Sequence, residues 1–235
     1  MKTKYTVNKD YFNVIDTHEK AYILGLFYAD GYNNEKRGRI VLNLQECDEE
    51  ILLKIKNCIE YTGPLLYDKK KLPRVNQFRL AINNKSLSKD LAKTGCMQAK
   101  TFKIIFPEFL DTKYLNSFIL GYFDGDGSIF RTSNKEYFYY GFSIIGTENL
   151  IQGILNYLND NLKLNCKLES AYRTKNKKGN QIIKELRISG KFNMITIMEH
   201  LYKDSPLFLK RKQEKYLSFK NDKTNINIGN HKKQM

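Results

Sequence analysis

Tight clusters of cysteine and histidine are missing from the sequence. The four cysteines are far apart and include no C-x-x-C pair: Cys47, Cys58, Cys96 and Cys166. The three histidines are scattered as well: His18, His200 and His231. This spacing argues against a zinc site, a disulfide framework and a His-Asn-His constellation. A reducing environment suits such a chain best.

Long hydrophobic runs are also missing. The first twelve residues, MKTKYTVNKDYF, have no apolar core, and the longest apolar stretch, Ala21 to Ala29, is far too short to span a bilayer. We therefore expect no signal peptide and no membrane partner. The expected location is the cytoplasm or another reducing compartment, such as a nucleoid or an organelle matrix, and not the outside of the cell.

Acidic residues are too few to balance the basic ones. The chain has 40 Lys and Arg against 25 Asp and Glu, a net charge of +15, and a pI of about 9.5. Both halves are basic, with 20 against 14 in residues 1–115 and 20 against 11 in residues 116–235. Such an excess favours a polyanionic partner, most commonly a phosphate backbone. A basic protein without that partner would have the same charge, so the motifs must decide.

The chain contains two similar segments. DTHEKAYILGLFYADG spans residues 16–31, and DTKYLNSFILGYFDGDG spans residues 111–127. Each opens with Asp-Thr, a good helix N-cap, and closes on Asp-Gly. In the first copy we expect Asp16 and Glu19 to form a capping box, and Gly31 and Gly127 to end the helices in the left-handed conformation. Each segment therefore predicts one helix of about three turns, apolar nearly all round and hence buried.

The similarity continues downstream at an offset of 100 residues. An alternating strand followed by an amphipathic helix is predicted in residues 40–55 and again in residues 141–158, with Asp48 and Thr147 as N-caps. A second strand follows in residues 77–83 and 185–191, each with an Arg on its open face. A further helix is expected at about residues 86–94 and 192–202.

These elements predict an α+β fold made of two αββαββα repeats. Packing the two all-apolar first helices against each other would bury both and create a pseudo-twofold axis. We divide the chain into residues 1–110, the first repeat with a lead-in segment; 111–220, the second repeat; and 221–235, a polar tail. Residues 69–71 and 175–178 are expected to be charged hairpin loops.

The two helix-closing motifs resemble those of the LAGLIDADG homing endonucleases. They read ILGLFYADG in residues 23–31 and ILGYFDGDG in residues 119–127, and the flanking DYF-x-x-IDT-x-E-x-AYILG is similar to free-standing members of that family. The resemblance extends from about residue 10 to residue 216. It implies a single-chain, metal-dependent endonuclease that cuts a long, non-palindromic double-stranded DNA site, held in a saddle of two antiparallel sheets. It also implies a monomer without an obligate protein partner.

The chemistry of the motif agrees with this resemblance. Gly25 and Gly121 lie mid-helix, where glycine costs about 1 kcal/mol relative to alanine, a cost explained if two helix backbones approach closely there. Asp30 and Asp126 lie at helix C-termini, where paired carboxylates are unfavourable unless a cation joins them. Oxygen ligands suit Mg²⁺, which can activate water beside a phosphate. One Asp-Gly alone would be an ordinary turn.

Several further positions follow from the resemblance. The family usually has an acid two residues before the last Asp, which the second copy keeps as Asp124 while the first has Tyr28. The metal set is completed by the residues preceding the two acids, Ala29 and Gly125. Lysines near the scissile phosphates are expected late in each repeat, and these are Lys100 and Lys212. The family places solvent-network groups at Gln45 and Glu46 in the first repeat and at Ile145 and Gly146 in the second. These pairs do not match each other, so we assign them no role.

Recognition of DNA is assigned to the open strand faces, because two-stranded ribbons fit the major groove. The candidate contact residues are polar side chains of the predicted strands: Arg39, Asn43, Arg79, Arg131, Ser143 and Arg187. Each of them could equally be a surface residue or a phosphate contact.

Two other functions remain open. One is an intron maturase of the same fold, which would bind RNA. The other is a DNA-binding regulator without catalysis, against which both Asp30 and Asp126 argue, because a binder has no need of two carboxylates beside phosphates.

Overall fold

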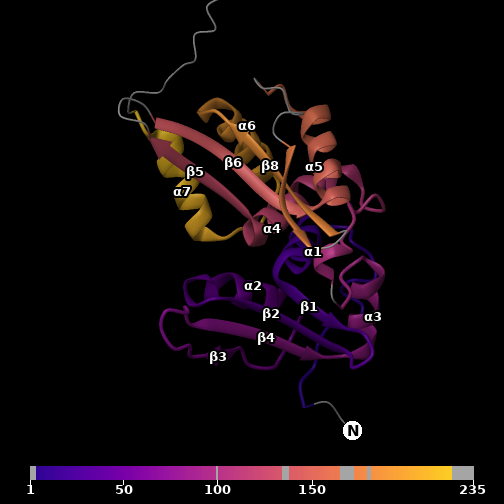
Figure 1. Cartoon of the computed structure of the whole chain (residues 1–235). Coiled ribbons are helices and arrows are strands. Elements are labelled where there is room, and N and C mark those ends of the chain that lie inside the picture. Colours follow the sequence, from indigo (N-terminus) through magenta and orange to yellow (C-terminus); the bar gives the residue numbers. More distant parts are fainter. Residues whose placement is uncertain (1–3, 99, 134–137, 165–171, 179–180, 224–235) are drawn as a thin grey trace, which may run out of the picture.

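The computed structural model describes residues 4–98, 100–133, 138–164, 172–178 and 181–223. Within them the chain forms two stacked α/β units with a pair of helices, α1 and α4, between the units (Figure 1). No helix in these ranges is long and apolar enough to cross a membrane. Two residues considered above, Cys166 and His231, lie outside the described residues, as does 224–235 of the polar tail.

The first repeat contains three α-helices and four strands. In chain order these are α1 (His18–Asp30), β1 (Gly31–Asn34), β2 (Arg39–Gln45), α2 (Glu49–Cys58), β3 (Leu66–Asp68), β4 (Gln77–Asn83) and α3 (Lys85–Lys93). A 3-10 turn, η1 (Glu46–Asp48), precedes α2. The segment that leads to the second repeat contains a further 3-10 turn, η2 (Lys100–Phe102).

The second repeat has the same order of elements and one more helix. It comprises η3 (Thr112–Tyr114), α4 (Leu115–Asp126), β5 (Gly127–Ser133), β6 (Phe138–Thr147), α5 (Glu148–Asn161), β7 (Tyr172–Lys178), β8 (Gln181–Ser189), α6 (Lys191–Tyr202) and α7 (Lys210–Asn221). The α+β prediction with two αββαββα repeats is confirmed. Helix α7 was missed by the sequence analysis, and residues 175–178 lie in strand β7 and not in a loop.

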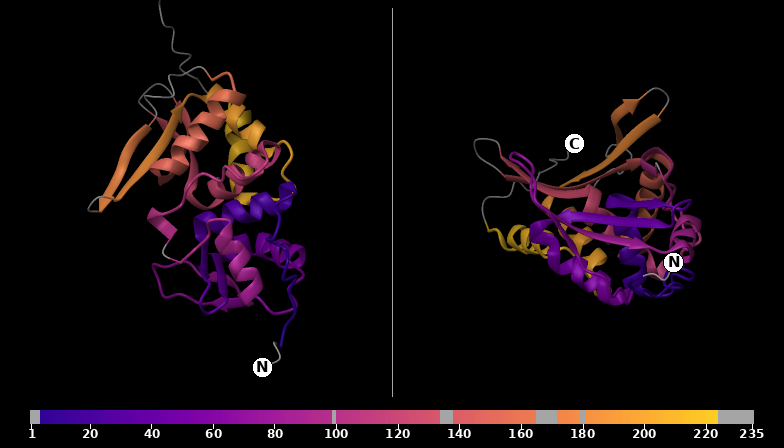
Figure 2. Two further views of the ribbon diagram at one scale, coloured as in Figure 1. Left: turned by 90° about the vertical axis from the view of Figure 1, so that its right-hand side faces the viewer. Right: turned by 90° about the horizontal axis from the view of Figure 1, so that it is seen from below.

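The two sheets share one topology. Their strand orders are β1-β2-β4-β3 and β5-β6-β8-β7, and every neighbouring pair is antiparallel. Equivalent residues also keep equivalent partners, since Asn43 pairs with Arg79 and Ser143 with Arg187. The β7–β8 hairpin projects from the body of the protein (Figure 2, left, orange).

Each sheet buries one face under helices. In β2 the even-numbered residues Ile40, Leu42 and Leu44 are buried, whereas Arg39 and Asn43 are exposed on the opposite face. The alternation follows from the period of two along a strand. The buried faces and the helices form a single hydrophobic core that runs through both repeats.

Helices α1 and α4 pack with their backbones in contact. A Cβ atom added at Gly25 would lie 2.0 Å from the Phe118 carbonyl oxygen, and one at Gly121 would lie 2.0 Å from the Tyr22 carbonyl oxygen. Only glycine fits at such distances. Both helices are buried along almost their whole length, as their all-apolar sequences predict.

The helix ends differ from expectation in three details. Thr17, not an Asp16–Glu19 capping box, caps α1 by accepting the Lys20 N–H. Asp48 gives no cap to α2, because its carboxylate binds Arg211 instead, while Thr147 does cap α5. The left-handed conformation predicted for the two closing glycines is wrong. Gly31 (φ −75°) and Gly127 (φ −107°) are extended, because each helix runs directly into a strand.

Glycine is required at these helix–strand junctions for space. A Cβ at Gly31 would lie 2.6 Å from the Phe27 carbonyl oxygen, and one at Gly127 would lie 2.7 Å from that of Phe123. The same two carbonyls accept the N–H groups of these glycines and so close the last turns of α1 and α4.

Candidate functional site

Asp30 and Asp126 lie together where α1 and α4 end. A Cβ added at Gly125 of α4 would meet the Asp30 Oδ2 atom at 3.0 Å and the Ala29 Cβ at 2.2 Å, so the ends of the two helices touch. The Asp30 side chain reaches solvent. Even so, desolvation by the surrounding protein and the charge of Asp126 raise the pKa of Asp30 to about 6. Burial also raises the pKa of Asp126.

Two lysines approach the same point from opposite repeats. Lys100, in η2, donates to the Ala29 carbonyl at 3.0 Å, and Lys212, in α7, donates to the carbonyls of Phe123 (2.5 Å) and Gly127 (2.8 Å). Desolvation lowers the pKa of both ammonium groups, that of Lys212 to about 8. Both lysines in turn lower the pKa values of the two acids, so the four groups form one electrostatic cluster.

The two acids offer a donor set that fits a magnesium ion. Two carboxylates at the negative ends of two helices repel each other, and a divalent cation between them would relieve that repulsion. Magnesium commonly takes one or two carboxylates and completes its shell with waters and phosphate oxygens. Within the described residues no group of three or more His, Cys, Asp and Glu side chains is arranged to hold a metal without such additional ligands. The backbone oxygen of Ala29 already accepts Lys100.

Tyr122 makes the two acids unequal. Its hydroxyl donates to the Ile145 carbonyl at 2.9 Å and also faces Asp126, where hydrogen bonding opposes the burial-driven rise in the pKa of Asp126. Asp30 has no corresponding tyrosine, because Leu26 occupies the equivalent place in α1. No sequence pattern predicts the hydrogen bond from Tyr122 to Ile145, because it depends on how α4 lies against the end of β6.

The ends of β2 and β6 also differ near the cluster. Gln45 and Glu46 are exposed, and Glu46 accepts the Asn76 side-chain amide at 3.1 Å. Gly146 is buried, and a Cβ there would lie 2.8 Å from the Tyr122 hydroxyl. The first repeat therefore presents polar groups here and the second does not.

Asp124 and Tyr28 occupy equivalent positions in the two motifs, and each has a hydrogen-bond partner that suits its side chain. Asp124 is 1% exposed and accepts hydrogen bonds from the Tyr22 hydroxyl (2.7 Å) and the Leu209 N–H (2.8 Å). Its equivalent Tyr28 is also 1% exposed and donates to the Thr94 carbonyl. Among the described residues, neither side chain forms a hydrogen bond with Asp30, Asp126, Lys100 or Lys212.

The first sheet presents three of the predicted contact residues on its open face. Arg39 and Asn43 are exposed, and Arg79 is half-buried. Arg79 donates to the Asn43 side-chain oxygen at 3.1 Å and pairs with Asp68 at 2.7 Å. The arginine is therefore held across three neighbouring strands.

The second sheet presents Arg187 alone among the predicted contact residues. Its guanidinium lies 3.8 Å from the centre of the Phe130 ring and 3.9 Å from the Glu185 carboxylate. Ser143, expected on the same open face, is 8% exposed, and its hydroxyl donates to Glu185 at 2.6 Å. The prediction that Ser143 is accessible is therefore wrong.

Arg131 lies on the other face of the second sheet. It has the same strand parity as buried Ile129, and it pairs at 2.7 Å with Asp222, just beyond α7. Its guanidinium also lies 4.4 Å from the centre of the Phe138 ring. The placement of Arg131 on the open strand face is wrong, because Arg131 has the parity of buried Ile129 along β5.

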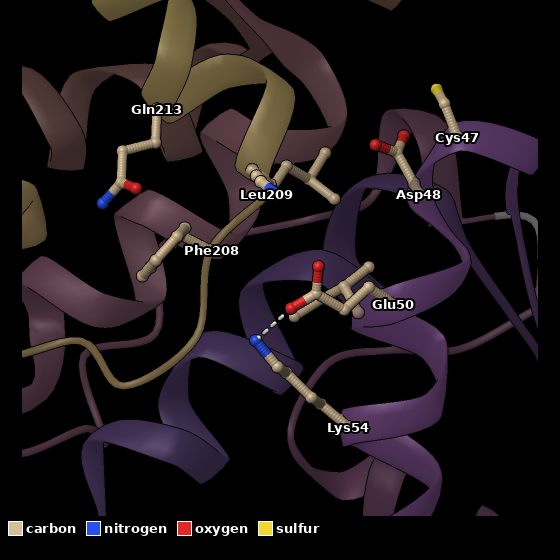
Figure 3. A pocket seen from close by; sticks show the side chains of 9 residues that line it. Cys47, Asp48, Glu50, Lys54, Phe208, Leu209 and Gln213 are labelled. Carbon is tan, nitrogen blue, oxygen red and sulfur yellow. Dashed lines mark ion pairs between the residues drawn. The ribbon is translucent and has the colours of Figure 1, made fainter. Parts of the chain in front are cut away.

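Arg211 links the two repeats beside the cluster. Its Nε atom lies 2.9 and 3.0 Å from the two carboxylate oxygens of Asp48, which is 4% exposed. Figure 3 shows the adjoining pocket, where Asp48 and Cys47 of the first repeat lie opposite Phe208 and Leu209 of the second. The start of α7 is thus attached to both repeats.

Comparisons with known proteins agree with this architecture. Residues 113–201 match the model of the LAGLIDADG-like domain. The chain is similar to the I-LtrWI LAGLIDADG homing endonuclease, solved bound to target DNA, with a TM-score of 0.56 and 16% identity over 91% of this chain and 89% of that chain. No curated protein matches the sequence.

Two LAGLIDADG meganucleases solved bound to uncleaved DNA are similar as well. For I-AabMI the TM-score is 0.52 at 11% identity, and for I-CpaMI it is 0.52 at 14% identity. Each match covers 85% of this chain and 89% of the other. At such identities the likeness defines the fold, and it extends across both repeats.

Proposed function

We propose that the chain is a member of the LAGLIDADG family and a site-specific endonuclease that makes a metal-dependent double-strand break in a long, non-palindromic DNA. One observation carries this proposal. Asp30 and Asp126 meet at the ends of paired helices, with Lys100 and Lys212 beside them. A protein that only binds DNA would gain nothing from two carboxylates placed between its binding surfaces, because they repel phosphate.

Asp30 and Asp126 would hold a divalent cation, with Mg²⁺ as the proposed ion. When bound, the ion would activate water and neutralise charge on the phosphate. A LAGLIDADG structure of similar fold, I-SmaMI with an uncleaved DNA target, was solved with calcium ions present. The raised pKa values of the two acids support the same role, since burial and, for Asp30, the charge of Asp126 disfavour their charged forms, and a divalent cation would offset this.

The two lysines would act on the phosphate at each strand. Their ammonium groups are held by carbonyls at the helix ends, so they are already positioned before any substrate arrives. A fixed positive charge stabilises the negative charge that develops on the phosphate as water attacks and the P–O bond breaks. The solved structures of similar fold include two variants of I-SmaMI, one with a single lysine-to-alanine substitution and one with two.

The open sheet faces would bind the DNA on either side of the cut. Arg39, Asn43 and Arg79 in the first sheet and Arg187 in the second are the contact residues that we retain. The net charge of +15 would favour binding through the phosphate backbone as well. Since one chain supplies both repeats, we propose that a monomer binds the site. We also propose action in a reducing compartment, to which the free thiols of Cys47, Cys58 and Cys96 are suited.

The decisive experiment is selection of cleaved sites from a randomised duplex library with Mg²⁺ present. We expect a single long consensus without twofold symmetry, cut on both strands. A parallel assay with structured RNA tests the maturase alternative. Specific RNA binding together with no DNA cleavage under any divalent metal would reject the endonuclease.

A further inference from the structure

Asp124 is a buried carboxylate that makes no hydrogen bond to Asp30, Asp126, Lys100 or Lys212 among the described residues. It is 1% exposed, and only one of its two oxygens has hydrogen-bond partners among the described residues, namely the Tyr22 hydroxyl and the Leu209 N–H. A half-satisfied buried carboxylate is costly for folding, which suggests that the position serves another purpose.

We propose that Asp124 is a positioning residue that fixes the first turn of α7 and thereby holds Lys212 in place, and that Tyr22 holds Asp124. The role in catalysis rests on the function proposed above, whereas the positioning itself does not. In this arrangement a hydrogen-bond chain runs from α1 through α4 to the start of α7.

The contacts of α7 support this assignment. Leu209 is the N-cap of α7, so the Asp124 carboxylate binds an N–H at the helix N-terminus, where a negative charge is favourable. Lys212 follows three residues later and returns to α4 through the carbonyls of Phe123 and Gly127. The first turn of α7 is thus bound to the end of α4 twice, once by its backbone and once by the lysine.

Charge complementarity strengthens the same link. The carboxylate of Asp124 opposes the desolvation that lowers the pKa of Lys212, as do those of Asp30 and Asp126. Lys212 is only 7% exposed, so it needs such a partner to remain an ammonium ion in a desolvated position. Asp124 therefore both places the lysine and supports its charge.

The lysine-bearing segment of the first repeat is also held by a hydrogen bond, but there the motif residue is the donor and not the acceptor. Tyr28, equivalent to Asp124, donates its hydroxyl proton to the Thr94 carbonyl, in the segment that leads to Lys100. Phe118, equivalent to Tyr22, packs edge-on against Tyr28 with ring centres 5.0 Å apart and forms no hydrogen bond. The two pairs, Asp124 with Tyr22 and Tyr28 with Phe118, are thus alternative ways of fastening the lysine-bearing segment.

Hydrogen exchange of the Leu209 amide tests the positioning without DNA. D124A should speed exchange of this amide about 10- to 100-fold, as expected for loss of a hydrogen bond to a charged group. D124N keeps an oxygen that can accept the same N–H and should restore most of the protection. Y202F is the matched control, because the Tyr202 hydroxyl is buried nearby without a hydrogen-bond partner among the described residues, so it should leave the Leu209 rate unchanged.

Strand-resolved cleavage tests the consequence for catalysis. K212M identifies the strand whose cutting depends on Lys212, and K100M identifies the other. D124A should slow the Lys212-dependent strand at least 10-fold more than the other strand under single-turnover conditions, with D124N and Y22F intermediate. Y28F should slow the Lys100-dependent strand instead. General destabilisation would slow both strands alike, so this selectivity separates positioning from a purely structural role.

Each result leads to a separate conclusion. If the wild-type protein cleaves no DNA but Leu209 exchange responds as expected, the endonuclease proposal fails and the positioning stands. The inference is overturned if D124A leaves Leu209 protected. It is also overturned if D124A slows both strands of a cleaving enzyme equally.

Discussion

The two repeats are nearly equivalent in backbone and differ in their side chains. Both have the strand order of one sheet, both place a glycine at the helix crossing, and both end their first helix on an acid. The lysines, however, come from different structures. Lys100 lies in a 3-10 turn of the connecting segment, whereas Lys212 lies in the first turn of a twelve-residue helix.

The difference extends to the acids and the sheets. Asp126 has Tyr122 beside it and Asp30 has no such partner. Arg79 is held by Asp68 and Asn43, whereas the aromatic ring of Phe130 supports Arg187. Symmetry is thus retained where backbones touch and lost where side chains reach outward. Packing of two helices at van der Waals distance allows few solutions, whereas a polar contact can be replaced by another.

We expect the largest effect from substitution of the acid that ends the first helix of each repeat. D30N and D126N should each reduce double-strand cleavage by about 10³-fold or more, because each removes a metal-ligand charge. Specific DNA binding, measured with Ca²⁺ in place of Mg²⁺, should remain close to that of the wild type. Full cleavage by either variant would contradict the shared site.

Alanine at the helix crossing should destabilise the fold equally in both repeats. G25A and G121A each place a Cβ about where a backbone carbonyl of the other helix lies, 2.0 Å away. We expect a loss of about 3 kcal/mol or more in the free energy of unfolding, at the upper end of overpacking effects. Urea unfolding measures this, with K89A on the exposed face of α3 as the control. A loss below 1 kcal/mol would mean that the helices can separate.

Arginine substitutions should separate the repeats. R79A should weaken binding or relax base preference on one side of the cut only, and R187A on the other side only. A bidentate guanine contact would cost about 1–3 kcal/mol, whereas a phosphate contact would lower affinity uniformly over sequence. Site-preference profiles of both variants decide this. Effects of both on the same half-site would refute the assignment of one sheet to each half.

The pH dependence gives a smaller and more graded effect. Because the pKa of Asp30 is raised to about 6, the charged form needed to hold a metal is lost as the pH falls through 6. Cleavage at saturating DNA should drop about fivefold between pH 6 and pH 5. In the metal-free protein the stability depends on pH in the opposite direction. Asp30 binds its proton more tightly in the folded than in the unfolded chain. The stability contributed by this group therefore falls as the pH rises from about 4 to 6.

Metal should therefore stabilise the protein only above that range. Addition of Mg²⁺ should raise the Tm at pH 8 and leave it nearly unchanged at pH 5, because binding to the folded state alone adds stability. Differential scanning calorimetry at the two pH values measures this. An equal rise in Tm at both would place the metal elsewhere.

Local patterns in the sequence predicted the repeated elements well. The all-apolar helices with central glycines, the period-two strands around Arg79 and Arg187, and the closing acids Asp30 and Asp126 each follow from a few neighbouring residues. The roles of the proposed catalytic and contact residues remain predictions that binding and cleavage experiments must test.

Long-range contacts could not be predicted in the same way. Arg131 pairs with Asp222, 91 residues further along, and Ser143 donates a hydrogen bond to Glu185 on another strand. The Asp48–Arg211 pair joins residues 163 positions apart. Helix α7 itself has only two buried residues, Lys212 and Tyr216, so its sequence carries almost no amphipathic signal.

During synthesis the ribosome releases α7 after the other helices and strands that the structure describes. Until residues 209–216 have emerged, a growing chain can pair α1 with α4 and build both sheets, yet Asp48 has no Arg211 and the end of α4 has no Lys212. A chain broken off before this point would carry both sheets and both acids but only one of the two lysines. On the proposed function, competence to cut both strands would therefore be acquired only once α7 has emerged, and products interrupted before it would bind without completing a double-strand break.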